Sequence, residues 1–141
     1  MKDGPTFLKQ PDIAKIVADE LLRFDDKLYK LIAYSIMPNH VHILIDTNIQ
    51  IPNFFDVSKW ESLEFEPLSN IMKKTKGPSA VYANRLLDRK GKFWQRESYD
   101  HYIRNVKEFN RVIAYILNNP VKAGLVKRWE DHPFTFLANQ S

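Results

Sequence analysis

The chain has 141 residues, of which 44% are hydrophobic and 13% aromatic, and its 21 basic residues outnumber 17 acidic ones to give a net charge of +4. This length fits one domain with a buried core, and we expect residues 1–141 to form a single domain. Cysteine is absent, which excludes disulfides, thiolate zinc sites and cysteine nucleophiles. We find no apolar run of membrane-spanning length and no signal peptide, so we expect a cytoplasmic protein, and the mild basic excess suits a polyanionic partner.

The first half of the chain predicts a helix followed by a β-hairpin. Apolar residues recur at helical spacing over residues 13–24. The segment 28–46 is rich in β-branched and aromatic residues and is interrupted by Pro38–Asn39, a pair that favours a tight turn. We therefore expect two antiparallel strands within residues 28–46.

The second half predicts further helices and one more strand. After an irregular loop, residues 67–91 indicate one or two helices broken at Gly77–Pro78. Residues 92–104 alternate in the manner of a strand, and residues 105–119 have the strongest helical pattern of the chain. The order of these elements predicts an α+β fold with a small antiparallel sheet.

The end of the helix predicted over 105–119 and the tail after it have weaker signals. Pro120 is expected to limit the helix over 105–119, and Gly124 suits the position just after a helix end. The tail "HPFTFLANQS" gives no clear signal for a helix or a strand.

Two histidines in the second hairpin strand are candidate metal ligands. Side chains alternate between the faces of a strand, so His40 and His42 point the same way, with Asp46 on that face as well. Neutral imidazole is the commonest protein ligand for metals, although a third ligand must then come from another element. On the residues alone, two roles remain equally open: a metal or catalytic role, and a structural role in which the ring nitrogens are hydrogen-bonded within the protein.

The helix predicted over 105–119 carries a tyrosine outside its apolar stripe. Tyr115 lies about 130° from the centre of that stripe, and Asn119 follows one turn later on the same flank. The alternative is a boundary tyrosine that covers apolar surface. If this flank packs over the histidine face, two imidazoles and an amide oxygen can bind Mg²⁺ or Mn²⁺ beside a phenol, an arrangement suited to phosphodiester transesterification.

The segment from Ser69 to Arg96 is strongly basic, with Asp88 as its one acid. Aromatic residues lie within it, as expected where a nucleic-acid single strand stacks its bases. A solvated helix face is the alternative. The candidate DNA-binding residues are Lys73, Lys74, Lys76, Arg85, Arg89, Lys92 and Arg96.

Four segments carry a resemblance to a known family: "MPNHVHILI", "LSNIMKKTKG", "GKFWQRESYDHYIRN" and "YILNNPVKAGLV". They resemble the REP-associated tyrosine transposases, which belong to the single-tyrosine HUH transposases, named for a His-hydrophobe-His motif. The resemblance runs from about Phe7 to Val126 and implies a ferredoxin-like antiparallel sheet with helices packed on it. It also implies cleavage of single-stranded DNA near hairpins at palindromic repeats.

The resemblance assigns a role to each candidate site residue. His40 and His42 match the HUH metal ligands, and Asn119 matches the third ligand. Tyr115 matches the nucleophile, which attacks the scissile phosphate to give a 5′-phosphotyrosine and a free 3′-hydroxyl. We therefore expect a DNA transposase with a divalent metal, Mg²⁺ or Mn²⁺, that associates with the nucleoid when bound to DNA and not with membranes.

The chain also departs from the family pattern. Members usually begin with a strand ahead of the first helix, whereas this chain opens with "MKDGPTFLKQP", so we expect the sheet to lack that strand. The exposed sheet edge is then expected to favour self-association, with a homodimer as one outcome. Two alternatives to the transposase stay open: an inactive relic that binds single-stranded nucleic acid, and a metal-dependent phosphoesterase without a covalent intermediate.

Overall fold

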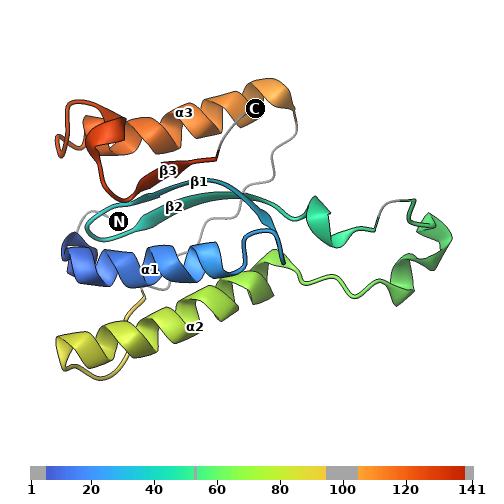
Figure 1. The fold of residues 1–141 in the computed structure, drawn as a ribbon, viewed down its shortest axis with the longest axis horizontal. Helices are drawn as coiled ribbons and strands as arrows, with labels where there is room; N and C mark the ends of the chain where they lie inside the picture. Colours follow the sequence, from blue (N-terminus) through green and yellow to red (C-terminus); the bar gives the residue numbers. More distant parts are fainter. Residues whose placement is uncertain (1–5, 53, 95–104, 139–141) are drawn as a thin grey trace.

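The computed structural model describes residues 6–52, 54–94 and 105–138, and over these ranges the protein has an α+β fold. Figure 1 shows three α-helices packed on a three-stranded antiparallel sheet. The helices and strands in chain order are α1 (Pro11–Arg23), β1 (Lys30–Ile36), β2 (Val41–Asp46), α2 (Leu68–Leu87), α3 (Val106–Lys122) and β3 (Thr135–Leu137). None of the described helices is both long and apolar enough to cross a membrane.

The sheet has the strand order β2-β1-β3, and the hairpin expected over 28–46 supplies two of its strands. Ser35 in the central strand is in register with His42 of β2 on one side and Thr135 of β3 on the other. The register shifts between Leu31 and Ala33, so Ile32 is an extra residue in β1. Because of this bulge, Ile32 and Ala33 both reach the face that α3 covers.

The helices form two layers on opposite faces of the sheet. The larger apolar cluster lies between the sheet and α1 with α2, and includes Ile13, Val17 and Leu21 at helical spacing. The smaller cluster joins Ile116 of α3 to Ala33 and Leu44 of the sheet. In Figure 1, α3 therefore lies on one side of the sheet, and α1 and α2 lie on the other.

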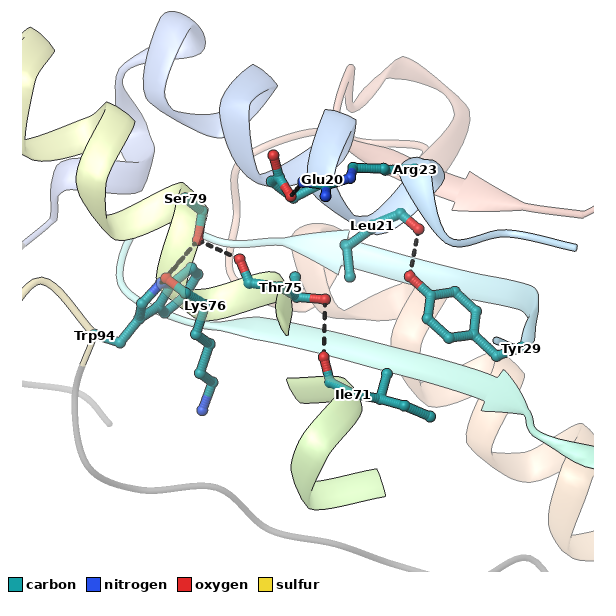
Figure 2. Close-up of polar contacts among 9 residues, drawn as sticks. All are labelled: Glu20, Leu21, Arg23, Tyr29, Ile71, Thr75, Lys76, Ser79 and Trp94. Carbon is teal, nitrogen blue, oxygen red and sulfur yellow. Dashed lines mark hydrogen bonds and ion pairs between the residues drawn. The ribbon is translucent and has the colours of Figure 1, made fainter. Parts of the chain in front are cut away.

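Polar groups inside the α1–α2 layer are satisfied by short-range hydrogen bonds (Figure 2). The buried Tyr29 hydroxyl donates to the Leu21 carbonyl, one of the last four carbonyls of α1, which have no partner within their own helix. Ser79, also fully buried, donates to the Thr75 carbonyl at 2.8 Å and accepts from the Trp94 indole at 3.0 Å. These bonds anchor the chain after α2 to its buried face.

Of the one or two helices predicted over 67–91, the structure has one, α2, which continues through Gly77 and Pro78, so the expected break there is wrong. Proline removes one backbone hydrogen bond of a helix, and packing against α1 outweighs this loss. The Trp94 indole also donates to the Lys76 carbonyl, just ahead of the proline. The helix ends at Leu87, and the cap residue Asp88 adopts the left-handed conformation with φ +51°.

The last helix, α3, continues two residues past Pro120 before it ends. Asn105 caps its start by accepting a hydrogen bond from the Glu108 amide. At its end, Gly124 has φ +77° and donates to the Val121 carbonyl, while Leu125 donates to the Pro120 carbonyl. This pattern is a Schellman motif, and glycine suits its left-handed position.

The tail differs from the expectation, and most of the last predicted strand lies outside the described residues. The tail contains β3, whose Phe136 stacks on Tyr34 with ring centroids 5.4 Å apart. The local pattern of this short strand is weak, and its pairing with β1 decides its conformation. Most of the strand predicted over 92–104 lies outside the described residues, and Lys92, Phe93 and Trp94 are not in a strand.

Candidate metal and tyrosine site

The histidine pair and Tyr115 come together at the start of β2, on the sheet face that α3 covers. His42 lies in β2, whereas His40, predicted within this strand, directly precedes it. The rings of His40 and His42 have centroids 4.7 Å apart, and the rings of His42 and Tyr115 have centroids 5.4 Å apart. The two pairs both meet edge to face, at interplanar angles of 81°. Leu44, two residues after His42 and on the same face of β2, packs with Ile116, so the apolar contact next to the site fixes α3 over the histidines.

Tyr115 is 57% exposed although its ring contacts His42. It lies beside the apolar stripe of α3, whose buried members are Ile116, Leu117 and Pro120. A residue that is held on one side by the protein and is exposed over more than half of its surface can reach a bound substrate, which a nucleophile must do.

Asn119 lies on the same flank of α3 as Tyr115. Both residues line an open groove of about 850 Å³, which also contains Arg111, Asn118, Lys122 and Trp129. Asp46, expected on the histidine face, is exposed and accepts a hydrogen bond from the Asn48 amide. Within the described ranges no three His, Cys, Asp or Glu side chains gather to hold a metal. His40 and His42 are not among the residues that line the groove, so Asn119 as their third ligand stays a prediction.

The electrostatic environment keeps both imidazoles neutral near pH 7. Burial lowers the pKa of His40 below its usual value. Burial, followed by the charge of His40, lowers the pKa of His42 to about 4. Neutral imidazole is the form that binds a metal, so the donor set fits a divalent cation.

Asn39 orients the first histidine, a role that its place in the turn did not reveal. The Nδ1–H of His40 donates to Oδ1 of Asn39 at 2.7 Å. This bond leaves the Nε2 lone pair of His40 as the one available to a ligand. The signal in the sequence is an amide directly before the histidine, although Pro38–Asn39 by itself indicates only a turn.

A second polar group that the sequence did not predict extends across the same sheet face from His42. Ser35, in register with His42, lies 3.1 Å from the hydroxyl of Thr135, and that hydroxyl lies 2.6 Å from Nδ1 of His132. Burial lowers the pKa of His132. Thr135 and His132 belong to the tail, which gave no clear signal in the sequence. Only the pairing of β3 with β1 brings them to Ser35.

The candidate DNA-binding residues on α2 lie on the other side of the sheet from Tyr115 (Figure 1). Lys73 and Arg85 are exposed, whereas Lys74 forms an ion pair of 2.7 Å with Glu66. Arg89 stacks over Phe7, 4.7 Å from the ring centroid, and donates to Asn84 and to the Lys92 carbonyl. The structure thus places α2, with Lys73, Lys74 and Lys76, on the sheet face opposite to α3. Arg89 and Lys92 follow the end of α2, and Arg96 lies outside the described residues.

Two curated proteins are similar to the chain. The protein named "Putative REP-associated tyrosine transposase" from Haemophilus influenzae is 27% identical over 107 residues, which cover 76% of this chain and 58% of that protein. The REP-associated tyrosine transposase of Escherichia coli strain K12 is 45% identical over 42 residues, which cover 30% of this chain and 26% of the relative. The matches thus span about half of the first relative's length and a quarter of the second's.

No family model matches the chain, and no solved structure gives a significant match. The relationship therefore rests on the two sequence matches, which agree with each other in the family they name. By sequence, the chain is thus similar to two proteins named as REP-associated tyrosine transposases.

Proposed function

We propose that this chain is a transposase that cuts and rejoins single-stranded DNA through a covalent bond to Tyr115. The observation that carries the proposal is the ring contact of 5.4 Å between Tyr115 and His42, which brings a phenol to a pair of neutral imidazoles. The names of the two relatives support the same class of reaction.

The proposed chemistry is an exchange of phosphodiester bonds. The Tyr115 oxygen attacks the scissile phosphorus and loses its proton, while the bond from phosphorus to the 3′-oxygen breaks. The leaving 3′-oxygen takes up a proton to become a free hydroxyl, and the 5′-phosphate stays on the tyrosine. Attack by another 3′-hydroxyl on this phosphotyrosine forms a new phosphodiester and restores Tyr115, so no external energy source is needed.

The proposed metal ligands are His40, His42 and Asn119. Two imidazole nitrogens and one amide oxygen form a mixed donor set that accepts Mn²⁺ or Mg²⁺. When bound, such a cation supplies Lewis-acid polarisation and orientation of the scissile phosphate. The protein contributes the neutral form of both imidazoles and the orientation of His40 by Asn39.

The test is incubation of the protein with a labelled single-stranded DNA hairpin and Mn²⁺, followed by denaturing electrophoresis. We expect a protein–DNA adduct that survives denaturation, and peptide mass spectrometry should locate it on Tyr115. Metal-dependent cleavage without an adduct would instead support a phosphoesterase that uses water. Binding without cleavage would support an inactive relic.

Matched variants make this test specific. Tyr115→Phe keeps the ring and should abolish the adduct, whereas Tyr82→Phe removes a hydroxyl of similar exposure on α2 and should have no effect. The double variant His40→Ala/His42→Ala should remove metal-dependent cleavage while circular dichroism shows the fold unchanged. Wild-type cleavage by the double variant would contradict the metal assignment.

A further inference from the structure

The groove beside Tyr115 has features that the proposed cleavage reaction does not use. Its floor is one flank of α3, where Arg111, Tyr115, Asn118 and Lys122 follow one another at intervals of four, three and four residues. This spacing keeps them on one side of the helix over roughly 16 Å, at 1.5 Å per residue. A cation thus lies at each end of the strip, with the phenol and an amide between them.

The wall of the groove is Trp129, which comes from the short 3₁₀ helix η4 (Trp129–Asp131). The left-handed turn at Gly124 ends α3 and lets the chain return so that η4 packs against α3. The Trp129 carbonyl accepts from the His132 amide at 3.0 Å, which closes this turn. Its indole is half-buried and borders the groove.

The charges around the groove favour an anionic ligand. Among the described residues that line it, Arg111 and Lys122 are basic and none is acidic. Glu130, next to Trp129, forms an ion pair of 3.3 Å with Arg128. An aromatic ring and two cations in one open groove suit a nucleic-acid single strand, whose bases can stack on the ring while its phosphates contact the cations.

We infer that this groove binds the nucleotides adjacent to the phosphate that Tyr115 attacks. One unpaired base stacks on Trp129, and the flanking phosphates contact Arg111 and Lys122. The occupant is single-stranded DNA, because a base within a duplex offers no free face to the indole. The identity of the ligand as DNA rests on the proposed function, whereas the groove itself does not.

Tryptophan fluorescence tests the stacking directly. In the Tyr115→Phe background, which cannot form an adduct, a short oligothymidine should quench part of the emission, and Trp129→Phe should remove that part from the difference spectrum. Trp129→Ala should weaken binding roughly tenfold, and Trp129→Phe should weaken it less, because a ring remains. Val106→Ala is the control and should keep the affinity, since Val106 is an exposed apolar residue of the same helix outside the groove.

The cations are tested by the salt dependence of binding. Arg111→Gln and Lys122→Gln should each reduce the slope of log K against log salt by about one, as expected for one lost phosphate contact. Lys107→Gln changes an exposed cation of the same helix outside the groove and should leave the slope unchanged. These variants keep the inference testable even if Trp129→Ala fails to fold.

The two proposals can fail separately. If the wild-type protein forms the adduct but Trp129→Ala and the two glutamine variants bind as tightly as the parent, the groove assignment is wrong and the nuclease stands. If oligothymidine quenches the fluorescence of Trp129 but the wild-type protein forms no adduct, the groove assignment is supported and the proposed reaction of Tyr115 is contradicted.

Discussion

At the scale of single residues, the orientation of His40 depends on the amide next to it. The hydrogen bond from Nδ1 of His40 to Asn39 fixes the tautomer that leaves Nε2 available. We predict that Asn39→Leu lowers the affinity for Mn²⁺ by about 10- to 100-fold, the usual effect of losing such a partner. Isothermal titration with Mn²⁺ measures this change. Asn39→Asp keeps an acceptor oxygen and should retain most of the affinity, so equal loss in both variants would contradict the role of the hydrogen bond.

Tyr29 is the residue whose ionisation should couple to folding at high pH. Burial, and then the charge of Asp25, raises the pKa of Tyr29 to about 12, against about 10 in an unfolded chain. The neutral phenol therefore stabilises the fold fully below pH 10, and this contribution is lost as the pH rises from 10 through 12. We predict that Tyr29→Phe loses less stability than the wild type over this interval.

The same variant should be less stable than the wild type at neutral pH. Removing the hydroxyl leaves the Leu21 carbonyl without its donor, so Tyr29→Phe should reduce the free energy of unfolding at pH 7 by about 1–2 kcal/mol. Urea denaturation at pH 7 and thermal melts between pH 9 and 12 give both quantities. The exposed Tyr82→Phe is the control, and an identical profile for the two variants would argue against a special role of Tyr29.

At the scale of elements, α2 presents cations on its outer surface while its other side packs on α1. The buried positions Ile71, Thr75, Ser79 and Ala83 are four residues apart, and Lys73 lies outside this stripe. We predict that the triple variant Lys73→Ala/Lys74→Ala/Lys76→Ala reduces the salt slope of single-stranded DNA binding by one to three units. Lys74 already pairs with Glu66, so its share should be the smallest.

Fluorescence anisotropy at several salt concentrations measures this slope. Because α2 and the α3 groove lie on opposite layers, the effect of the lysine variants should add to that of the groove variants. An unchanged slope in the triple variant would show that α2 does not contact the phosphates and that its lysines form a solvated face.

At the scale of the whole molecule, the described sheet has β2 at one edge and the short β3 at the other. Backbone groups at a sheet edge can pair with a strand of another copy. We predict self-association that increases with protein concentration, measured by light scattering coupled to size-exclusion chromatography. A monomer at every concentration up to the millimolar range, together with a high melting temperature, would contradict this expectation.

Local periodicity was sufficient to predict which residues of the candidate site share a face of one element. The alternation of side chains along a strand put His40 and His42 on one face, and the pitch of a helix put Tyr115 and Asn119 on one flank. Both patterns depend only on the geometry of a single element, and α1, the hairpin and α3 were predictable for the same reason. The family resemblance followed from the same short segments.

Contacts between distant segments were decided by the tertiary structure alone. The pairing of β3 with β1 and the packing of Tyr115 against His42 join parts of the chain that no local pattern relates. Trp129 reaches the α3 flank only because the turn at Gly124 reverses the chain. The continuity of α2 through Pro78 likewise depends on α1, since the packing energy of a helix face exceeds the local cost of one missing hydrogen bond.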